Sequence, residues 1–250
     1  MLSIWLYSLI SVFIVSLISL IGIITLSINS KKLERALIYM ISFSAGALLG
    51  DAFIHLLPEA VESSGFTFSV SLFILSGIGF SFVAEKIIKW RHCHHLTTKS
   101  HPHPLTTMNL IGDSVHNFID GIIIAASYFI SIPVGMATTI AVIFHEIPQE
   151  ISEYGVLLYG GYTKSRALLA NFLIALTAVL GAIITLILGA QSESLLTFLI
   201  PFAAGNFIYI AGSDLIPEIH KESENILNSL IQLILFILGI ALMALLLIFG

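Results

Sequence analysis

Long apolar stretches, each about the length of a membrane-spanning helix, follow one another along the chain and are separated by short polar breaks. A bilayer core of about 30 Å needs roughly 20 apolar residues per helix. The pattern predicts an all-α integral membrane protein with eight transmembrane helices in a single transmembrane domain, residues 1–250. The spans lie at approximately 4–26, 36–58, 66–88, 108–130, 133–158, 166–189, 195–217 and 227–249.

The composition excludes several classes of protein. Of the 250 residues, 57% are hydrophobic and 10% are charged, and the mean hydropathy is +1.03. Soluble domains are roughly 25% charged, so a soluble enzyme is excluded. A net charge of −5 gives no basic excess for binding nucleic acid. The lone Cys93 excludes a disulfide framework and a multi-cysteine metal site.

The basic residues predict the orientation in the membrane. Every second polar break carries Lys or Arg, and together these breaks hold all ten basic residues of the chain. The positive-inside rule makes that side cytoplasmic. We therefore expect a multi-pass protein of the cell membrane with both termini outside the cytoplasm. The first stretch has no basic residues before it, so it reads as a retained anchor rather than a signal peptide.

Ionisable residues recur inside four of the predicted spans, where a charge costs about 2.5–3.5 kcal/mol on insertion scales. In the fourth and fifth spans they follow helical spacing and form one stripe on each helix. Together with three amides beside them, the residues are Asp51 and His55 in the second span; Asp113, His116, Asn117 and Asp120 in the fourth; His145, Glu146, Gln149, Glu150 and Glu153 in the fifth; and Asn206, Asp214 and Glu218 in or at the end of the seventh.

Imidazoles and several carboxylates without a buried cation predict a divalent metal ion, because unpaired carboxylates repel one another. Mixed nitrogen and oxygen ligands suit Zn²⁺, Fe²⁺ or Mn²⁺. The alternative is structural, with these side chains hydrogen-bonding neighbouring helices together. For two facing stripes of ionisable residues, the metal interpretation is favoured.

Two segments carry a family resemblance. The run His116–Gly121 resembles the HNFxDG motif of the ZIP family of zinc/iron permeases, and His145–Glu150 resembles its HExPxE motif. Supporting matches are Gly46–Glu59 and Gly205–Glu218. The resemblance implies a 3+2+3 bundle of two inverted repeats around the fourth and fifth helices, with the metal path along helices 2, 4, 5 and 7. The shared pattern x-L-[LI]-P-E in His55–Glu59 and Asp214–Glu218 agrees with such repeats.

The resemblance also implies roles for the polar residues. It places the transport site at His116, Asn117, Asp120, His145, Glu146 and Gln149, and it implies import of metal into the cytoplasm. Gln149 stands where the family usually has Glu or His, which favours one tight metal site over two and makes Glu150 a candidate substitute ligand. Asp51 and His55 would lie toward the outer mouth, Asp113 and Glu153 along the path, and Asp214 and Glu218 toward the cytoplasmic exit.

The loop at residues 91–107 is rich in histidine, with His92, His94, His95, His101 and His103. Such tracts bind metal through composition without fixed geometry. One interpretation is a segment that receives exiting metal; the other is a linker whose histidines are incidental to turnover.

We therefore expect a carrier whose transported substrate, rather than cofactor, is Zn²⁺, with Fe²⁺, Mn²⁺ and Cd²⁺ left open. The rivals are an intramembrane zinc hydrolase that uses His145 and Glu146, since HExxH-type sites bind metal with the Glu as base, and a metal sensor without flux. Small-residue faces at Ala45–Ala47 and Gly77–Gly79 suit packing within the chain or a homodimer.

Deleting residues 92–103 tests the loop. We expect metal uptake into proteoliposomes to fall less than it does on His145→Ala, because a loop without fixed geometry assists release but does not form the site. Complete inactivation by the deletion would show instead that the loop is obligatory.

Overall fold

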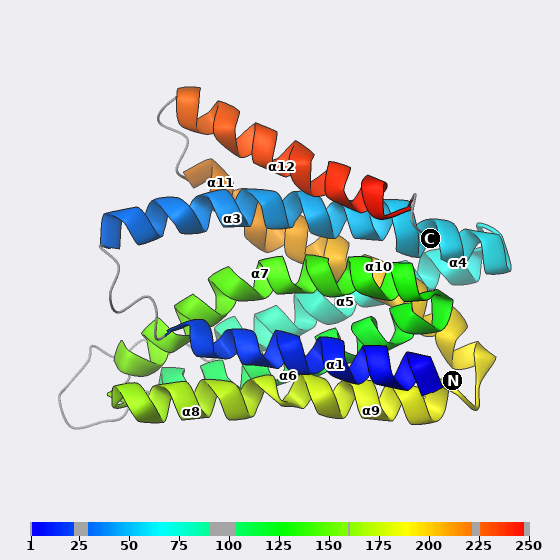
Figure 1. Cartoon of the computed structure of the whole chain (residues 1–250), viewed down its shortest axis with the longest axis horizontal. Coiled ribbons are helices and arrows are strands. Elements are labelled where there is room, and N and C mark those ends of the chain that lie inside the picture. Colours follow the sequence, from blue (N-terminus) through cyan, green and yellow to red (C-terminus); the bar gives the residue numbers. More distant parts are fainter. Residues whose placement is uncertain (1, 23–29, 91–103, 160, 222–225, 248–250) are drawn as a thin grey trace.

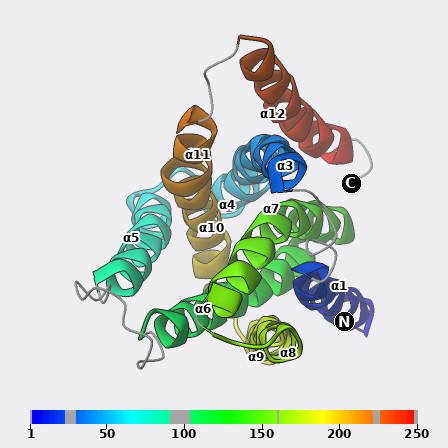
Figure 2. The same cartoon turned by 90° about the vertical axis from the view of Figure 1, so that its left-hand side faces the viewer.

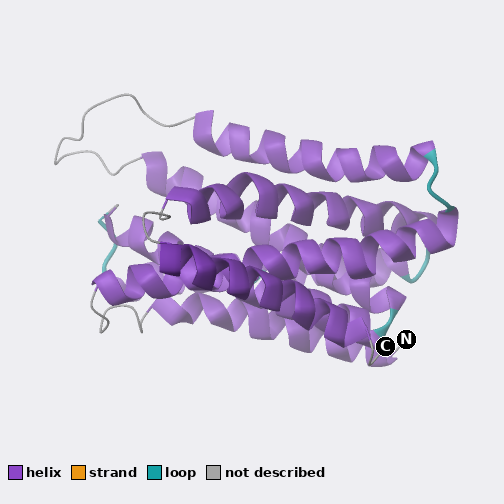
Figure 3. Cartoon of the chain, turned by 90° about the horizontal axis from the view of Figure 1, so that it is seen from above, coloured by secondary structure: helices purple, strands orange, loops and turns teal. Residues whose placement is uncertain are grey.

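The computed structural model describes residues 2–22, 30–90, 104–159, 161–221 and 226–247, and these are almost entirely helical, with no strand among them (Figure 1, Figure 3). The helices run roughly along one long axis. Their bounds are α1 (Leu2–Ile18), the 3-10 turn η1 (Ser19–Ile21), α3 (Ser30–Gly50), η2 (Asp51–Leu56), α4 (Leu57–Ser64), α5 (Phe68–Trp90), α6 (Pro104–Ile130), α7 (Ile132–Tyr159), α8 (Lys164–Ala175), α9 (Thr177–Gly189), α10 (Glu193–Tyr209), η3 (Ile210–Leu215), α11 (Ile216–Lys221) and α12 (Ile226–Leu247).

Six helical segments of the described chain are long and apolar enough to cross a membrane: Leu2–Ile21, Ala36–Ser64, Phe68–Lys86, Lys164–Gly189, Ser194–His220 and Ile226–Leu247. The chain is therefore an integral membrane protein of the multi-pass, all-helical class. Helices α6 and α7 are not among the six, although they have 27 and 28 residues. These two helices carry the ionisable stripes, which reduce their apolar character.

Helices occupy the described parts of the predicted apolar stretches, with local differences at their ends. Helix α6 begins at Pro104, inside the predicted loop at 91–107, because proline is tolerated in the first turn of a helix, where its missing N–H has no partner to lose. The five loop histidines, His92, His94, His95, His101 and His103, lie outside the described residues.

Two π-helical segments were not predicted from the sequence. Segments η2 and η3 interrupt the second and seventh apolar stretches, and each is followed within two residues by proline, Pro58 or Pro217. Proline cannot donate a backbone hydrogen bond, which favours a local change of helical register. π-Helical turns are rare and occur frequently at functional sites.

The closest helix pairs combine early and late parts of the chain. Helix α3 packs along α12, α10 packs along α5, and α6 packs along α9 and α7. Segment η2 contacts α10, while η3 contacts α3. Helix α1 lies against α7 and α9. Figure 2 shows α6 and α7 between the group that contains α3, α10 and α5 and the group that contains α1, α8 and α9.

Both termini lie at the same end of the bundle, where α1 begins and α12 ends (Figure 1). Helices α3, α8 and α12 begin at the opposite end. We call this opposite end the loop end. The basic residues at the beginnings of α3 and α8, which were predicted to lie on the same side of the membrane, are therefore at one end of the molecule.

Glycines allow the tightest helix pairs to touch backbone to backbone. A methyl group added to Gly77 of α5 would overlap the carbonyl oxygen of Phe202 in α10, and one added to Gly205 of α10 would overlap that of Ile74 in α5. Gly46 and Gly239 stand in the same reciprocal relation between α3 and α12, as do Gly121 and Gly181 between α6 and α9. Gly46 and Gly77 thus serve packing within the chain. The homodimer stays a prediction.

Gly77→Ala and Gly79→Ala form a matched pair in one helix. We expect Gly77→Ala to lower the free energy of unfolding by about 1–3 kcal/mol, because overpacking against a backbone carbonyl forces the helices apart. A methyl group at Gly79 meets nothing within 4 Å, so Gly79→Ala should be neutral or slightly stabilising, as expected for replacing a helical glycine.

The measurement is thermal unfolding of the purified variants in detergent. Equal melting temperatures for the two variants would contradict the close α5–α10 contact.

Candidate metal site

The candidate site lies between α6 and α7, which are joined at Ser131 and pack against each other in antiparallel directions. Residues at i, i+3, i+4 and i+7 share one face of a helix, so each helix directs its stripe toward the other. The side chains at the centre are buried: Asn117, Asp120 and Glu146 are 0% exposed and His145 is 2% exposed.

Four side chains bring one ligand atom each into a single small volume. His116, Asp120, His145 and Glu146 have nitrogen or oxygen atoms that all lie within 4.8 Å of one another. The Nε2 atom of His145 lies 3.1 Å from Oδ2 of Asp120 and 3.3 Å from Oε1 of Glu146. The Nε2 atom of His116 lies 3.1 Å from Oε1 of Glu146 and 3.2 Å from Nε2 of His145.

Several carboxylate oxygens in and beside this cluster accept no hydrogen bond from the described residues, although they are buried. They include Oδ1 of Asp120, Oε2 of Glu146 and Oδ2 of Asp113. Buried polar groups are normally satisfied, and a buried anion without a partner is costly. The cluster therefore has the ligand atoms of a cation site, together with buried negative charge that a bound cation would balance.

The two amides of the stripes converge on Asp113 rather than on the four-residue cluster. Nδ2 of Asn117 donates to Oδ1 of Asp113 over 2.9 Å, and Nε2 of Gln149 donates to the same oxygen over 3.4 Å. Asp113 is 4% exposed. These contacts orient the Asp113 carboxylate and leave its second oxygen for another partner.

Glu150 follows Glu146 by one turn of α7, but its side chain pairs with α8 rather than with the four-residue cluster. Its Oε2 atom accepts a hydrogen bond from the amide of Asn171 in α8, and its other oxygen has no partner among the described residues. The structure thus does not bring Glu150 into contact with the two histidines. Glu153, one turn along α7 from Gln149, lines the cavity described next.

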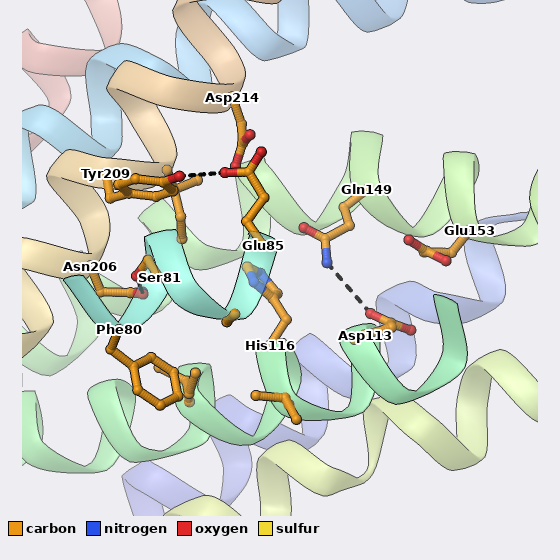
Figure 4. A pocket seen from close by; sticks show the side chains of 15 residues that line it. Phe80, Ser81, Glu85, Asp113, His116, Gln149, Glu153, Asn206, Tyr209 and Asp214 are labelled. Carbon is orange, nitrogen blue, oxygen red and sulfur yellow. Dashed lines mark hydrogen bonds between the residues drawn. The ribbon is translucent and has the colours of Figure 1, made fainter. Parts of the chain in front are cut away.

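A cavity of about 160 Å³ connects the cluster to the space between α5 and α10 (Figure 4). His116 belongs to both the cluster and the cavity wall, and its side chain is 23% exposed. Asp113, Gln149 and Glu153 form one side of the cavity. Glu85 of α5, Tyr209 of α10 and Asp214 of η3 form the other, and Figure 4 shows the hydroxyl of Tyr209 donating to Glu85.

Three residues of this region were missed in the sequence reading. Glu85 falls near the end of the third apolar stretch, next to Lys86. Asn171 and Thr138 are uncharged, and single polar residues in a span are usually structural. The signal available for Glu85 was its carboxylate inside a predicted span.

The remaining predicted path residues lie on either side of the cluster. In η2, Asp51 Oδ1 lies 2.9 Å from His55 Nδ1, and Oδ2 of Asp51 accepts from Thr138 of α7 over 2.7 Å. Asp51 and His55 are buried. On the other side, Asp214 is exposed and lines the cavity, whereas Glu218 is not among the described residues of its wall.

Comparison with known proteins gives one consistent result. The model of the ZIP zinc transporter family matches residues 2–109 and 91–247. The zinc transporter ZIP13 of Danio rerio is 30% identical over 86% of this chain and 76% of its own length. The zinc transporter YKE4 of Saccharomyces cerevisiae is 30% identical over 86% and 73%, and the ZIP13 homolog of Drosophila melanogaster is 27% identical over 96% and 88%.

The family match spans nearly the whole chain, and the buried His/Asp/Glu cluster lies in the two segments that resemble the family's motifs. The chain belongs to the ZIP zinc transporter family, and Zn²⁺ is its transported substrate rather than a cofactor.

Proposed function

We propose that this protein carries Zn²⁺ across the membrane toward the cytoplasm through a site whose ligands are His116, Asp120, His145 and Glu146. The observation that carries the assignment is the convergence of these four ligand atoms in a buried, acidic cluster.

The spacing of the ligand atoms suits zinc. A tetrahedral Zn²⁺ with ligand bonds of 2.0–2.2 Å holds neighbouring ligand atoms roughly 3.3–3.6 Å apart. Five of the contacts within the cluster measure 3.1–3.5 Å. Two neutral imidazoles and two carboxylates would leave a bound divalent ion electrically balanced, which a buried site requires.

Asp113, Asn117, Gln149 and Glu153 form the next stage of the path in this proposal. Asp113 and Glu153 offer carboxylate oxygens, while the amides of Asn117 and Gln149 hold Asp113 in place. An amide that donates to a neighbouring carboxylate contributes no negative charge to a second metal. This supports one tight site with a weaker transit position beside it.

We further propose eight membrane crossings, with α6 and α7 as the fourth and fifth, and two inverted three-helix repeats around them. In this scheme each of the first three spans corresponds to one of the last three, and α6 corresponds to α7. The observed contacts follow this correspondence. The contact of α3 with α12 matches that of α10 with α5, and the contact of η2 with α10 matches that of η3 with α3. The two π-helical segments occupy corresponding places in this scheme.

The cluster can be reached through a cavity on one side only, which supports a conformation of the protein that is open toward the loop end. On the loop side, His116 faces a cavity that reaches the exposed Asp214. On the other side, Asp51, His55 and Thr138 are buried, and Asp51 is hydrogen-bonded to each of the other two. With the loop end cytoplasmic, as the basic residues predict, this is the state that releases metal inside the cell. Asp51 and His55 then mark the closed outer entrance.

Transport without hydrolysis is the function that this arrangement favours. In a zinc hydrolase of the HExxH type, the glutamate acts as a base on water rather than as a ligand. Here Oε1 of Glu146 lies 3.1 Å and 3.3 Å from the two histidine nitrogens, within the ligand set itself. The acidic cavity that continues from the cluster is of no use to a sensor without flux but is suited to a carrier.

The assignment is tested by Zn²⁺ uptake into proteoliposomes. His145→Ala and Asp120→Ala should each reduce the uptake rate by more than about tenfold, since even the outer partners of metal ligands contribute 10- to 100-fold. Glu62→Ala removes an exposed carboxylate near the end of α4 and should leave uptake close to that of the unmodified chain. Near-normal uptake by both ligand variants, with normal insertion into the membrane, would refute the site.

Gln149→Glu tests the role of the amide. The substitution removes the hydrogen bond to Asp113 and adds a carboxylate beside it, so we expect tighter Zn²⁺ binding or a second bound ion. Isothermal titration calorimetry of the purified protein measures both affinity and stoichiometry, and Gln191→Glu, at an exposed position between α9 and α10, serves as the control. Unchanged binding in Gln149→Glu would count against the argument from the neutral amide.

A further inference from the structure

A second cavity, of about 300 Å³, lies away from the metal site between α11 and α12. Its wall is mostly apolar, with Ile219, Leu233 and Phe236 among its members, and it includes the polar side chains His220, Ser229 and Gln232. Figure 1 shows both α11 and the beginning of α12 at the loop end of the bundle.

Gln232 is the unusual member of this wall. It lies within α12, whose sequence is otherwise strongly apolar after Ser229, and only 4% of its surface is exposed. Among the described residues, no hydrogen bond joins its side-chain amide. The amide lines the cavity, and in the apolar surroundings of a membrane an amide without a hydrogen-bond partner is unfavourable. A ligand with a hydrogen-bond acceptor in the cavity would satisfy it.

The cavity borders the surface that faces lipid. Leu233 in its wall is 53% exposed, and its neighbours Leu230 and Ile234 are 51% and 55% exposed. In a membrane protein such a surface contacts acyl chains. Gln232 follows the first residue of α12 by six positions, a depth of about 9 Å along the helix. That depth is close to the boundary between polar headgroups and hydrocarbon.

We propose that this cavity binds one diacyl phospholipid from the leaflet at the loop end. The amide of Gln232 donates to an ester or phosphate oxygen of the lipid, and one acyl chain lies along Ile219, Leu233 and Phe236. Ser229 and His220 stand nearer the end of the bundle, where a headgroup would lie. A phospholipid meets both requirements of the wall, because it joins hydrogen-bond acceptors to an apolar chain and is abundant at that depth.

The test is lipid binding measured by native mass spectrometry on the full chain, purified in detergent and freed of lipid. The probe is palmitoyl-oleoyl phosphatidylcholine. We expect the unmodified chain to bind one molecule of the added lipid and Gln232→Leu to bind it about fivefold more weakly, the effect of one lost hydrogen bond. Leu233→Trp, which fills the cavity while keeping the amide, should bind it more weakly as well.

Gln191→Leu makes the same chemical change at an exposed position remote from the cavity and should retain the lipid as the unmodified chain does. Glycerophosphocholine, which has the headgroup without acyl chains, should not bind. Equal lipid retention by the unmodified chain, Gln232→Leu and Leu233→Trp would overturn the proposal, because it would assign the lipid to the general annulus around the helices. Zn²⁺ binding by each variant verifies that it is folded.

Discussion

The structure depends on one electrostatic constraint, the burial of several carboxylates inside an apolar bundle. Asp120 and Glu146 are fully buried, Asp113 nearly so, and each has an oxygen without a hydrogen-bond partner among the described residues. Buried anions are costly unless a cation balances them or they take up protons, and a permanent cation such as lysine would occupy the place of the transported ion. A mobile divalent ion satisfies the constraint transiently. It explains why α6 and α7, the helices that carry the ionisable stripes, lie between the other two groups of helices (Figure 2).

The two halves of the bundle resolve this constraint differently. In segment η2, Asp51 is hydrogen-bonded to His55 of the same segment and accepts a hydrogen bond from Thr138 of α7. Segment η3 places Asp214 at an exposed position on the cavity. The sealed side excludes water from the cluster while the open side admits it. An exchange of these two conditions would move access to the ion from one membrane face to the other without moving the ligands far along the membrane normal.

The all-helical membrane class, the family and the facing stripes on α6 and α7 were predictable from the sequence, because hydropathy and helical spacing are local properties. The hydrogen-bond partner of each polar side chain was not predictable, because it depends on contacts between helices. Gln149 was expected as a weak ligand, but it donates to Asp113; Glu150 was expected as a substitute ligand, but it bonds Asn171. Which way a side chain turns depends on neighbours more than twenty residues away. The π-helical segments were also missed, since periodicity assumes a regular helix.

The reciprocal glycine contacts have a consequence for the biogenesis of the protein. Gly46 meets α12, and Gly77 meets α10, both of which are synthesised after α6 and α7. The ribosome therefore delivers α3 and α5 to the membrane long before their closest partners exist. The faces of α3 and α5 that carry Gly46 and Gly77 must therefore contact lipid or the insertion machinery until the last two spans have been inserted. Assembly therefore ends when α10 packs against α5 and α12 packs against α3. Neither the early helices nor the late helices can complete these contacts alone.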